Sequence, residues 1–225
     1  MSATDALSGT HPYEADPYRL GRGGGGGRAY ATGHGAGGPA SKRVIVGYGF
    51  WLFLLSDIVL FSCLFAAHAV LRNETAGGPT GPQLFNPTIV AIETACLLAS
   101  TFVAGLSAVA AGARNLFWTE VLLFITGIFG LAFLLLEASD FASMVAQGAG
   151  PTVSAYWSSF FTLVGCHGCH VTLGLLWLGT MMGQIFFKGF RPNVMRRLVC
   201  YYLFWHMLDI IWVALFTVAY LIGEG

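Results

Sequence analysis

The chain has 225 residues with 11 basic and 11 acidic side chains, so only 10% of its residues are charged. Hydrophobic residues make up 56% of it and aromatic residues 14%. Soluble domains carry roughly 25% charged residues, so this composition excludes an ordinary soluble enzyme and predicts a membrane protein. The net charge of zero argues against a nucleic-acid partner, which usually needs a basic patch.

The first 43 residues differ in composition from the rest of the chain. They contain the consecutive glycines Gly23 to Gly27 and no apolar run. Such a segment cannot bury enough surface to offset its ordering entropy, so we predict a flexible Gly-rich tail over residues 1–43. These 43 residues contain no apolar h-region of their own, which argues against a signal peptide. No Gly-Lys-Ser/Thr follows the glycines, which argues against a phosphate-binding loop.

Long apolar segments make up most of the remaining sequence, and breaks rich in Gly and Pro separate several of them. Each segment is longer than the ~20 residues that a helix needs to cross the hydrocarbon core. The sequence therefore predicts an all-α, polytopic membrane protein whose residues 44–223 form a bundle of five transmembrane helices. The expected spans are 44–71, 88–113, 116–136, 154–187 and 198–223.

Basic residues indicate the orientation of these spans. The tail holds five of them, the loop after the second span holds Arg114, and the loop after the fourth holds Lys188, Arg191, Arg196 and Arg197. In a five-span chain all of these fall on one side, and Arg72 falls on the other. Because cytoplasmic loops carry the excess of Lys and Arg, we expect a cytoplasmic N-terminus and a periplasmic C-terminus.

Several charged or titratable side chains lie inside the expected spans. Asp57 lies near the middle of the first span, and Glu137 and Asp140 stand at the outer end of the third. A charge at bilayer depth costs roughly 2.5–3.5 kcal/mol, so each such residue needs a partner or a function. We interpret the set as groups that hydrogen-bond between helices, with proton handling or a lipid site as the functional alternative. The set is Asp57, Glu93, Glu137, Asp140, His167, His170, His206 and Asp209.

Residues 166–170 read Cys-His-Gly-Cys-His, the pattern of covalent haem c attachment. The pattern lies in the middle of a span, out of reach of attachment enzymes, and structural zinc usually needs loops and a second ligand pair. We therefore expect neither haem c nor zinc here. Histidines that face each other across a bundle can also hold haem b or copper. The candidates for this alternative are His68, His167, His170 and His206.

Four motifs in order carry a family resemblance. Residues 49–62 read Gly-Phe-Trp-Leu-Phe-Leu-Leu-Ser-Asp-Ile-Val-Leu-Phe-Ser, and 92–94 read Ile-Glu-Thr. Residues 165–171 read Gly-Cys-His-Gly-Cys-His-Val, and 204–212 read Phe-Trp-His-Met-Leu-Asp-Ile-Ile-Trp. Together they resemble subunit III of the haem-copper terminal oxidases and, in that family, the five-helix subunit III of cytochrome bo-type ubiquinol oxidases. The resemblance covers about residues 46–223.

The resemblance implies roles for some of the buried polar groups. Asp57 falls on the family's buried carboxylate, which reacts with carbodiimide in relatives that carry Glu there, so it is the candidate for proton handling. Glu93 falls on the glutamate of the Val-Glu-Thr stretch, and Glu137 and Asp140 on an acidic pair spaced by three. The two cysteines of 165–171 occupy variable positions of the motif, which removes the haem c interpretation.

The resemblance also implies the function of the whole chain. We expect it to bind no haem, copper or other metal and to contain no catalytic residue, because the haems, the copper and ubiquinol oxidation belong to subunit I. It would pack on subunit I, in a complex with subunits II and IV, and would hold phospholipid and support proton uptake. The complex would lie in the bacterial inner membrane, reduce oxygen to water and pump protons. A small transporter or channel and a membrane b-type cytochrome remain the alternatives.

Overall fold

Five long α-helices account for nearly all of the chain that the computed structural model describes, which is residues 42–75 and 87–221. Every one of the five is long and apolar enough to cross a membrane. This confirms the predicted all-α class with five membrane-spanning helices. The helices are α1 (Lys42–Leu71), α3 (Pro87–Gly112), α4 (Leu116–Ala146), α5 (Ala155–Lys188) and α6 (Pro192–Leu215), and a short π-helix η1 (Phe216–Leu221) continues α6.

The end of α4 and the starts of α6 and α1 differ from the expected boundaries. The helix expected over 116–136 continues to Ala146, so Glu137 and Asp140 lie within α4 and not at its end. The helix expected from 198 begins at Pro192, because proline is pre-organised for the first turn of a helix and loses no hydrogen bond there. Residues 42 and 43, assigned to the tail, begin α1. The rest of the predicted tail lies outside the described residues.

A tight turn joins α3 to α4. Arg114 has a positive φ of 56°, and the N–H groups of Arg114 and Asn115 donate to the carbonyls of Ala111 and Ala110. This pair of bonds is the Schellman arrangement that closes the C-terminus of a helix. The side chain of Asn115 then accepts from the N–H of Trp118 and caps α4. Asn115 thus ends one helix and begins the next, which forces α3 and α4 to run antiparallel.

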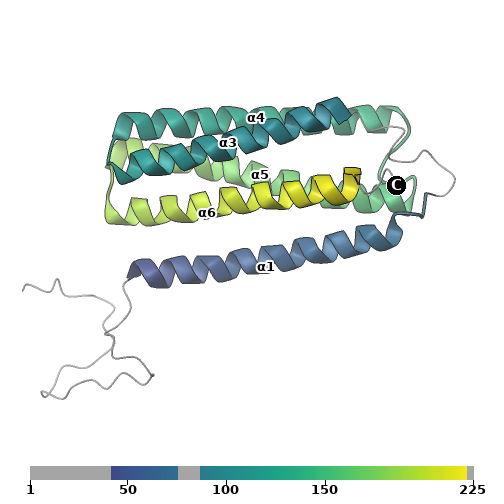
Figure 1. Cartoon of the computed structure of the whole chain (residues 1–225), viewed down its shortest axis with the longest axis horizontal. Coiled ribbons are helices and arrows are strands. Elements are labelled where there is room, and N and C mark those ends of the chain that lie inside the picture. The colour runs from purple at the N-terminus through teal and green to yellow at the C-terminus, as the bar shows by residue number, and fades with distance from the viewer. Residues whose placement is uncertain (1–41, 76–86, 222–225) are drawn as a thin grey trace, which may run out of the picture. The chain divides into compact units, whose positions relative to one another are not determined.

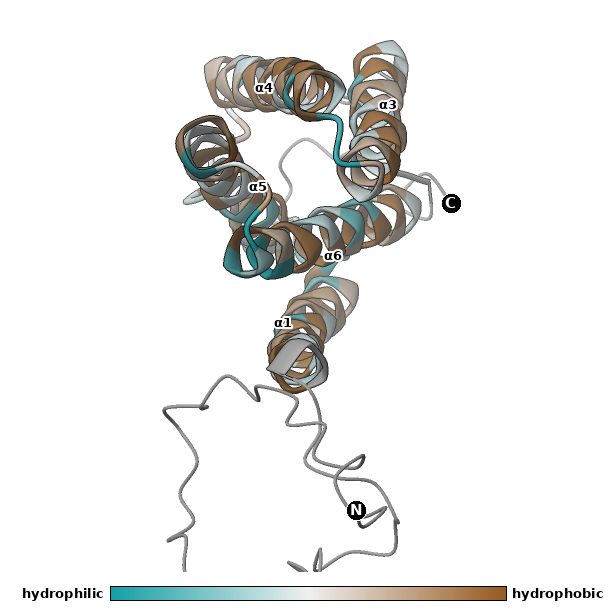
Figure 2. Cartoon of the chain, turned by 90° about the vertical axis from the view of Figure 1, so that its left-hand side faces the viewer, coloured by the Kyte–Doolittle hydropathy of each residue, from teal (hydrophilic) through white to brown (hydrophobic). Residues whose placement is uncertain are grey.

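The four helices α3 to α6 run side by side (Figure 1). They form a closed ring, in which α3 packs on α4, α4 on α5, α5 on α6 and α6 on α3. Helix α1 packs outside this ring, against α5 and α6. Figure 2 shows the ring along its helices, with α1 next to α6. The ring has the up-down architecture of a four-helix bundle, and α1 is an addition to it.

The buried residues of α3 and α4 repeat at alternating steps of three and four residues. This is the spacing of a helix seam that faces its neighbours in a bundle. Many of these seam residues are small or hydroxylated, as is usual where membrane helices approach closely. On α3 they are Val90, Glu93, Leu97, Ser100, Ala104, Ser107 and Ala111; on α4 they are Thr119, Leu123, Thr126, Gly130, Phe133, Glu137, Asp140 and Met144.

Basic side chains gather at one end of the bundle. Because the helices alternate in direction, the starts of α1, α4 and α6 and the ends of α3 and α5 meet at the same end (Figure 1). This end carries Arg114 in the α3–α4 turn and, around the α5–α6 turn, Lys188, Arg191, Arg196 and Arg197. The opposite end carries Arg72. The predicted orientation requires such a cluster of basic residues at the cytoplasmic end, and the orientation itself stays a prediction.

Candidate functional site

Asp57 and His170 form a polar contact between α1 and α5. The Oδ2 atom of Asp57 lies 3.9 Å from Nε2 of His170, and Asp57 is buried on the inward stripe of α1. Nδ1 of His170 lies 2.8 Å from the carbonyl oxygen of Cys166. A carbonyl can only accept, so Nδ1 carries a proton and Nε2 is the nitrogen left to face Asp57. Asp57 and His170 thus face each other between α1 and α5, at a distance longer than a direct hydrogen bond.

A second polar contact holds the far end of α1. The ring of buried His68 packs on Tyr156 of α5, with ring centres 5.5 Å apart. Its Nδ1 lies 3.0 Å from Oγ of Ser159. Since the Ser159 hydroxyl donates to the carbonyl of Tyr156, its oxygen is free to accept from Nδ1–H of His68. Two histidine contacts, about three turns apart, thus fix α1 to α5.

His167 lies at the centre of an aromatic enclosure. Its side chain is fully buried, and its ring centre lies 5.2 Å from that of Trp212, 5.8 Å from that of Phe133 and 6.4 Å from that of Phe61. Neither ring nitrogen has a hydrogen-bond partner among the residues that the structure describes. His167 therefore packs against three other helices, α1, α4 and α6. His170, one turn further along α5, contacts Asp57.

Three carboxyl groups meet between α3, α4 and α5. Glu93, Glu137 and Asp140 are all buried, and Glu137 interacts electrostatically with both of the others. Glu137 lies directly against Gly168, because a Cβ placed on that glycine would stand 3.0 Å from Oε2 and 3.1 Å from Oε1 of the carboxyl. The expectation that Glu137 and Asp140 stand at a helix end is wrong, since neighbouring helices enclose them. The glycine between the two histidines of 165–171 makes room for this carboxyl.

Aromatic side chains of α6 donate to hydroxyl groups of α3 along the full contact of the two helices. Trp212 donates to Thr94 at 3.1 Å, and Trp205 donates to Ser100 at 3.1 Å. The hydroxyls of Tyr202 and Ser107 lie 2.7 Å apart. Each bond gives an indole or phenol the polar partner that it needs when buried. We refer to these three bonds as the α3–α6 ladder.

His206 and Asp209 belong to the same contact. Asp209 is buried and His206 is half-buried, and the Asp209 carboxyl lies near both the Thr101 hydroxyl of α3 and His206. Oγ1 of Thr101 and Oδ1 of Asp209 nevertheless have no partner with hydrogen-bond geometry among the described residues. Asp209 thus faces α3, and the spacing by three puts His206 on the same side of α6.

The histidines and cysteines do not converge in the described parts of the chain. Within residues 42–75 and 87–221, no three His, Cys, Asp or Glu side chains lie close enough together to hold a metal ion. Sγ of Cys166 lies 3.8 Å from Nδ1 of His170 on the same helix, and Cys169 is exposed. The alternative of a haem b or copper site needs His68, His167, His170 or His206 as facing pairs, and His68 and His170 instead contact Ser159 and Asp57.

Sequence reasoning found these residues but missed their pairing. It named Asp57 and His170 as separate polar groups of two spans, whereas the structure brings them within 3.9 Å of each other. It missed the α3–α6 ladder entirely, although Ser100 and Ser107 stand seven residues apart on α3. That spacing puts two hydroxyls on one helix face and was the available signal.

Comparisons with known proteins show what this chain is similar to. The sequence model of the family described as cytochrome c oxidase subunit III matches residues 30–224. The chain is 46% identical over 180 residues to the cytochrome bo(3) ubiquinol oxidase subunit 3 of Pseudomonas aeruginosa, which covers 78% of this chain and 84% of that protein. It is 40% identical over 177 residues to the quinol oxidase subunit 3 of Bacillus subtilis, which covers 79% and 87%.

Proposed function

The chain belongs to the cytochrome c oxidase subunit III family, and from that premise we propose that it is the non-redox subunit III of a proton-pumping ubiquinol oxidase. The proposal rests on two relatives that are 46% and 40% identical to this chain. Their names are cytochrome bo(3) ubiquinol oxidase subunit 3 and quinol oxidase subunit 3. In this role the chain packs on subunit I, within a complex that includes subunits II and IV, while that complex reduces oxygen to water.

The interior of the bundle supports an accessory role. Its polar groups are used between helices: the Asp57–His170 contact and the His68–Ser159 bond hold α1, and the α3–α6 ladder holds the ring. Haems and copper are assigned to subunit I, and this chain binds none. Its contribution is to stabilise subunit I, to bind phospholipid and to support proton uptake, with Asp57 as the candidate proton-handling group.

The test is purification of the chain with its native partners. An affinity tag is placed on this chain, the complex is extracted from bacterial inner membranes in mild detergent, and the haem spectrum and oxygen uptake are measured. We expect a multi-helix haem protein to co-purify, with oxygen uptake driven by ubiquinol and not by reduced cytochrome c. The separated chain should give no signal in a pyridine-haemochrome assay.

Each alternative gives a different result in this experiment. Uptake driven by cytochrome c instead of ubiquinol would contradict the quinol assignment. Stoichiometric haem on the separated chain would identify a membrane cytochrome. A chain that purifies without a haem partner and moves a substrate across vesicle membranes would be a transporter or channel.

A further inference from the structure

Buried polar atoms that lack a hydrogen-bond partner gather on the helices of the ring. Among the residues that the structure describes, all such side-chain atoms except Oδ2 of Asp57 lie on α3 to α6. Natural structures pair buried polar atoms with protein groups or with ordered water, so each of these atoms needs a partner. They belong to Glu93 and Thr101 of α3, Glu120 and Glu137 of α4, His167 of α5, and Tyr201 and Asp209 of α6.

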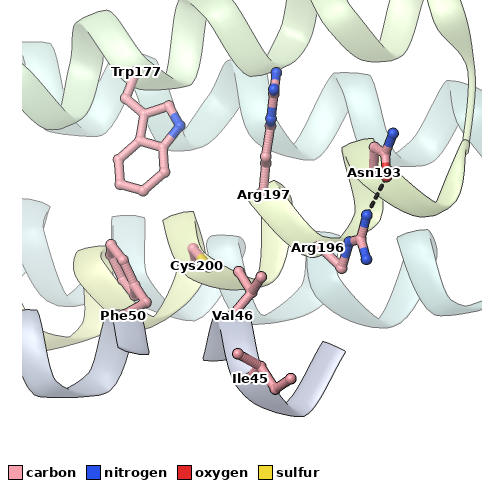
Figure 3. A pocket seen from close by; sticks show the side chains of 8 residues that line it. All are labelled: Ile45, Val46, Phe50, Trp177, Asn193, Arg196, Arg197 and Cys200. Atoms are coloured by element: carbon pink, nitrogen blue, oxygen red, sulfur yellow. Dashed lines mark hydrogen bonds between the residues drawn. The ribbon is translucent and has the colours of Figure 1, made fainter. Parts of the chain in front are cut away.

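Polar side chains at the surface of the basic end do find partners. A pocket of about 500 Å³ lies there between α1, α5 and α6, and Arg196 and Arg197 of α6 line it (Figure 3). Arg196 donates to the side-chain oxygen of Asn193, the bond that Figure 3 marks, and Arg197 donates to that of Gln184 at 3.0 Å. The unpartnered atoms are therefore a feature of the buried faces of the ring.

The indole of Trp205 crosses the ring and relates the heights of its helices. It comes from α6, lies against Gly130 of α4 and Gly174 of α5, and donates to Ser100 of α3 at 3.1 Å. All four helices of the ring therefore meet at this height. The heights of other ring residues follow from it at 1.5 Å per residue.

Two carboxyl groups lie at one height, further from the basic end. Glu93 stands seven residues from Ser100, and Glu137 stands seven from Gly130, so both lie ~10 Å beyond Trp205. The two groups interact electrostatically, and Glu93 is 1% exposed and Glu137 5%. Oε1 of each nevertheless lacks a partner among the described residues. The two carboxyls are thus buried neighbours that no direct hydrogen bond joins at these oxygens.

His167 adds a different kind of unpartnered group at the same height. It precedes Gly168, against which the Glu137 carboxyl lies, and its ring packs on Trp212 with centres 5.2 Å apart. The side chain is fully buried, and neither ring nitrogen has a partner in the described parts of the chain. A neutral imidazole has one N–H donor and one acceptor. This height of the ring therefore needs a partner that both donates and accepts.

From these observations we infer that the ring binds water at this height, and that one water molecule bridges Glu93 and Glu137 by donating to Oε1 of each. Water carries two donors and two lone pairs, so the same molecule can also accept a bond. Within residues 42–75 and 87–221 no three ligands converge as a metal cation would require. At about one buried water per 27 residues, a chain of the described length holds about six, so a water here is ordinary.

The bridge would join α3 to α4 at the end of the bundle opposite to their tight turn. Asn115 connects the two helices at the basic end, and the carboxyl groups lie about 22 residues away on each helix. A bridging water is nearly as favourable in enthalpy as a direct hydrogen bond. The inference goes beyond the proposed function and does not depend on it.

The experiment is a cryo-electron microscopy map of the complex with the full chain, at a resolution that shows ordered water. We expect a peak at hydrogen-bond distance, about 2.5–3.0 Å, from Oε1 of both Glu93 and Glu137. A direct bond between the two carboxyls with no peak between them would overturn the inference. A peak with six or more oxygen ligands at about 2.3–2.6 Å would overturn it too, in favour of a calcium-like cation.

Two variants test the same bridge by infrared spectroscopy in ordinary water and in water labelled with oxygen-18. The label shifts the O–H stretching bands of bound water and leaves the bands of the protein in place. The test variant is Glu93→Met with Glu137→Met, which removes both acceptors at similar volume. The control is Glu120→Met, which removes an unpartnered buried oxygen from α4, about five turns from Glu137.

The test variant should lose a label-sensitive band that the wild type and the control share. Identical label-sensitive bands in all three proteins would overturn the inference. If the test variant fails to assemble, the wild-type map decides by itself. The bridge lies within this chain, so the map tests it whether or not a haem partner co-purifies. Failure of the proposed function and failure of the bridge are therefore separate results.

Discussion

Gly174 offers a sharp test of the packing at the centre of the ring. Trp205 of α6 is buried between Gly174 of α5 and Gly130 of α4. A Cβ on Gly174 would stand 2.9 Å from Cζ3 of the Trp205 ring and 3.2 Å from Cε1 of Phe204. A Cβ on Gly130 would stand 2.9 Å from the opposite edge of the same indole, at Cη2 and Cζ2. The indole therefore has no room to retreat from a methyl group at position 174.

Replacing Gly174 with Ala should destabilise the folded chain by about 1–3 kcal/mol, because the helix-propensity gain of Ala offsets part of the costs of overpacking and of a lost hydrogen bond. Overpacking of a filled core costs about 1–3 kcal/mol. A displaced Trp205 would also lose its 3.1 Å bond to Ser100, and an interhelical hydrogen bond in a membrane contributes ~0.6 kcal/mol. The matched control is Gly179→Ala on the same helix, where a Cβ meets nothing within 4 Å. Since Ala favours a helix more than Gly does, the control should be neutral or slightly stabilising.

The assay heats the complex and then measures the monodisperse fraction that remains, by size-exclusion chromatography with fluorescence detection. Gly174→Ala should lower the melting temperature and the yield of assembled complex, and Gly179→Ala should leave both near the wild-type values. If the two variants have the same melting temperature, the close contact between α5 and Trp205 does not limit packing and the reasoning is refuted.

Three further predictions follow from the polar contacts between helices. Tyr202→Phe and Ser107→Ala should each cost ~0.6 kcal/mol, up to roughly 1.7, in detergent unfolding, and the double variant should cost no more than one of them; additive losses would show that the hydroxyls do not interact. Replacing both His206 and Asp209 with Leu should reduce the yield of assembled complex more than Asp57→Asn does, because Asp209 faces α3 inside the ring. A wild-type yield from this double variant would contradict the structural role of the pair. A hydrophobic carbodiimide should label Asp57 in the wild type, and the Asp57→Asn variant should not be labelled at this position. This variant should keep the wild-type initial rate of oxygen uptake with ubiquinol. A rate near zero at normal assembly would mean that Asp57 takes part in the chemistry.

The sequence alone determined the fold class because the signal for a membrane helix is local. A run of about 20 apolar residues predicts a spanning helix whatever its neighbours are. The helix satisfies its own backbone hydrogen bonds, and lipid solvates its apolar side chains. The same rule explains the error at the end of α4. The apolar run stops at Glu137, and only the neighbouring helices reveal that Glu137 and Asp140 are buried and that the helix continues to Ala146.

The pairings inside the bundle were decided by the tertiary structure. Spacing by three or four residues shows that His167 and His170 share a face, but not that α1 and α5 are neighbours or at which height they meet. Asp57 and His170 are 113 residues apart and meet at 3.9 Å, and Trp205 meets Ser100 across 105 residues. The seam of a helix shows which face of that helix is buried but not which helix packs against it, because any helix with a complementary seam can pack there. The axial heights that the packed helices adopt select the partner of each polar group.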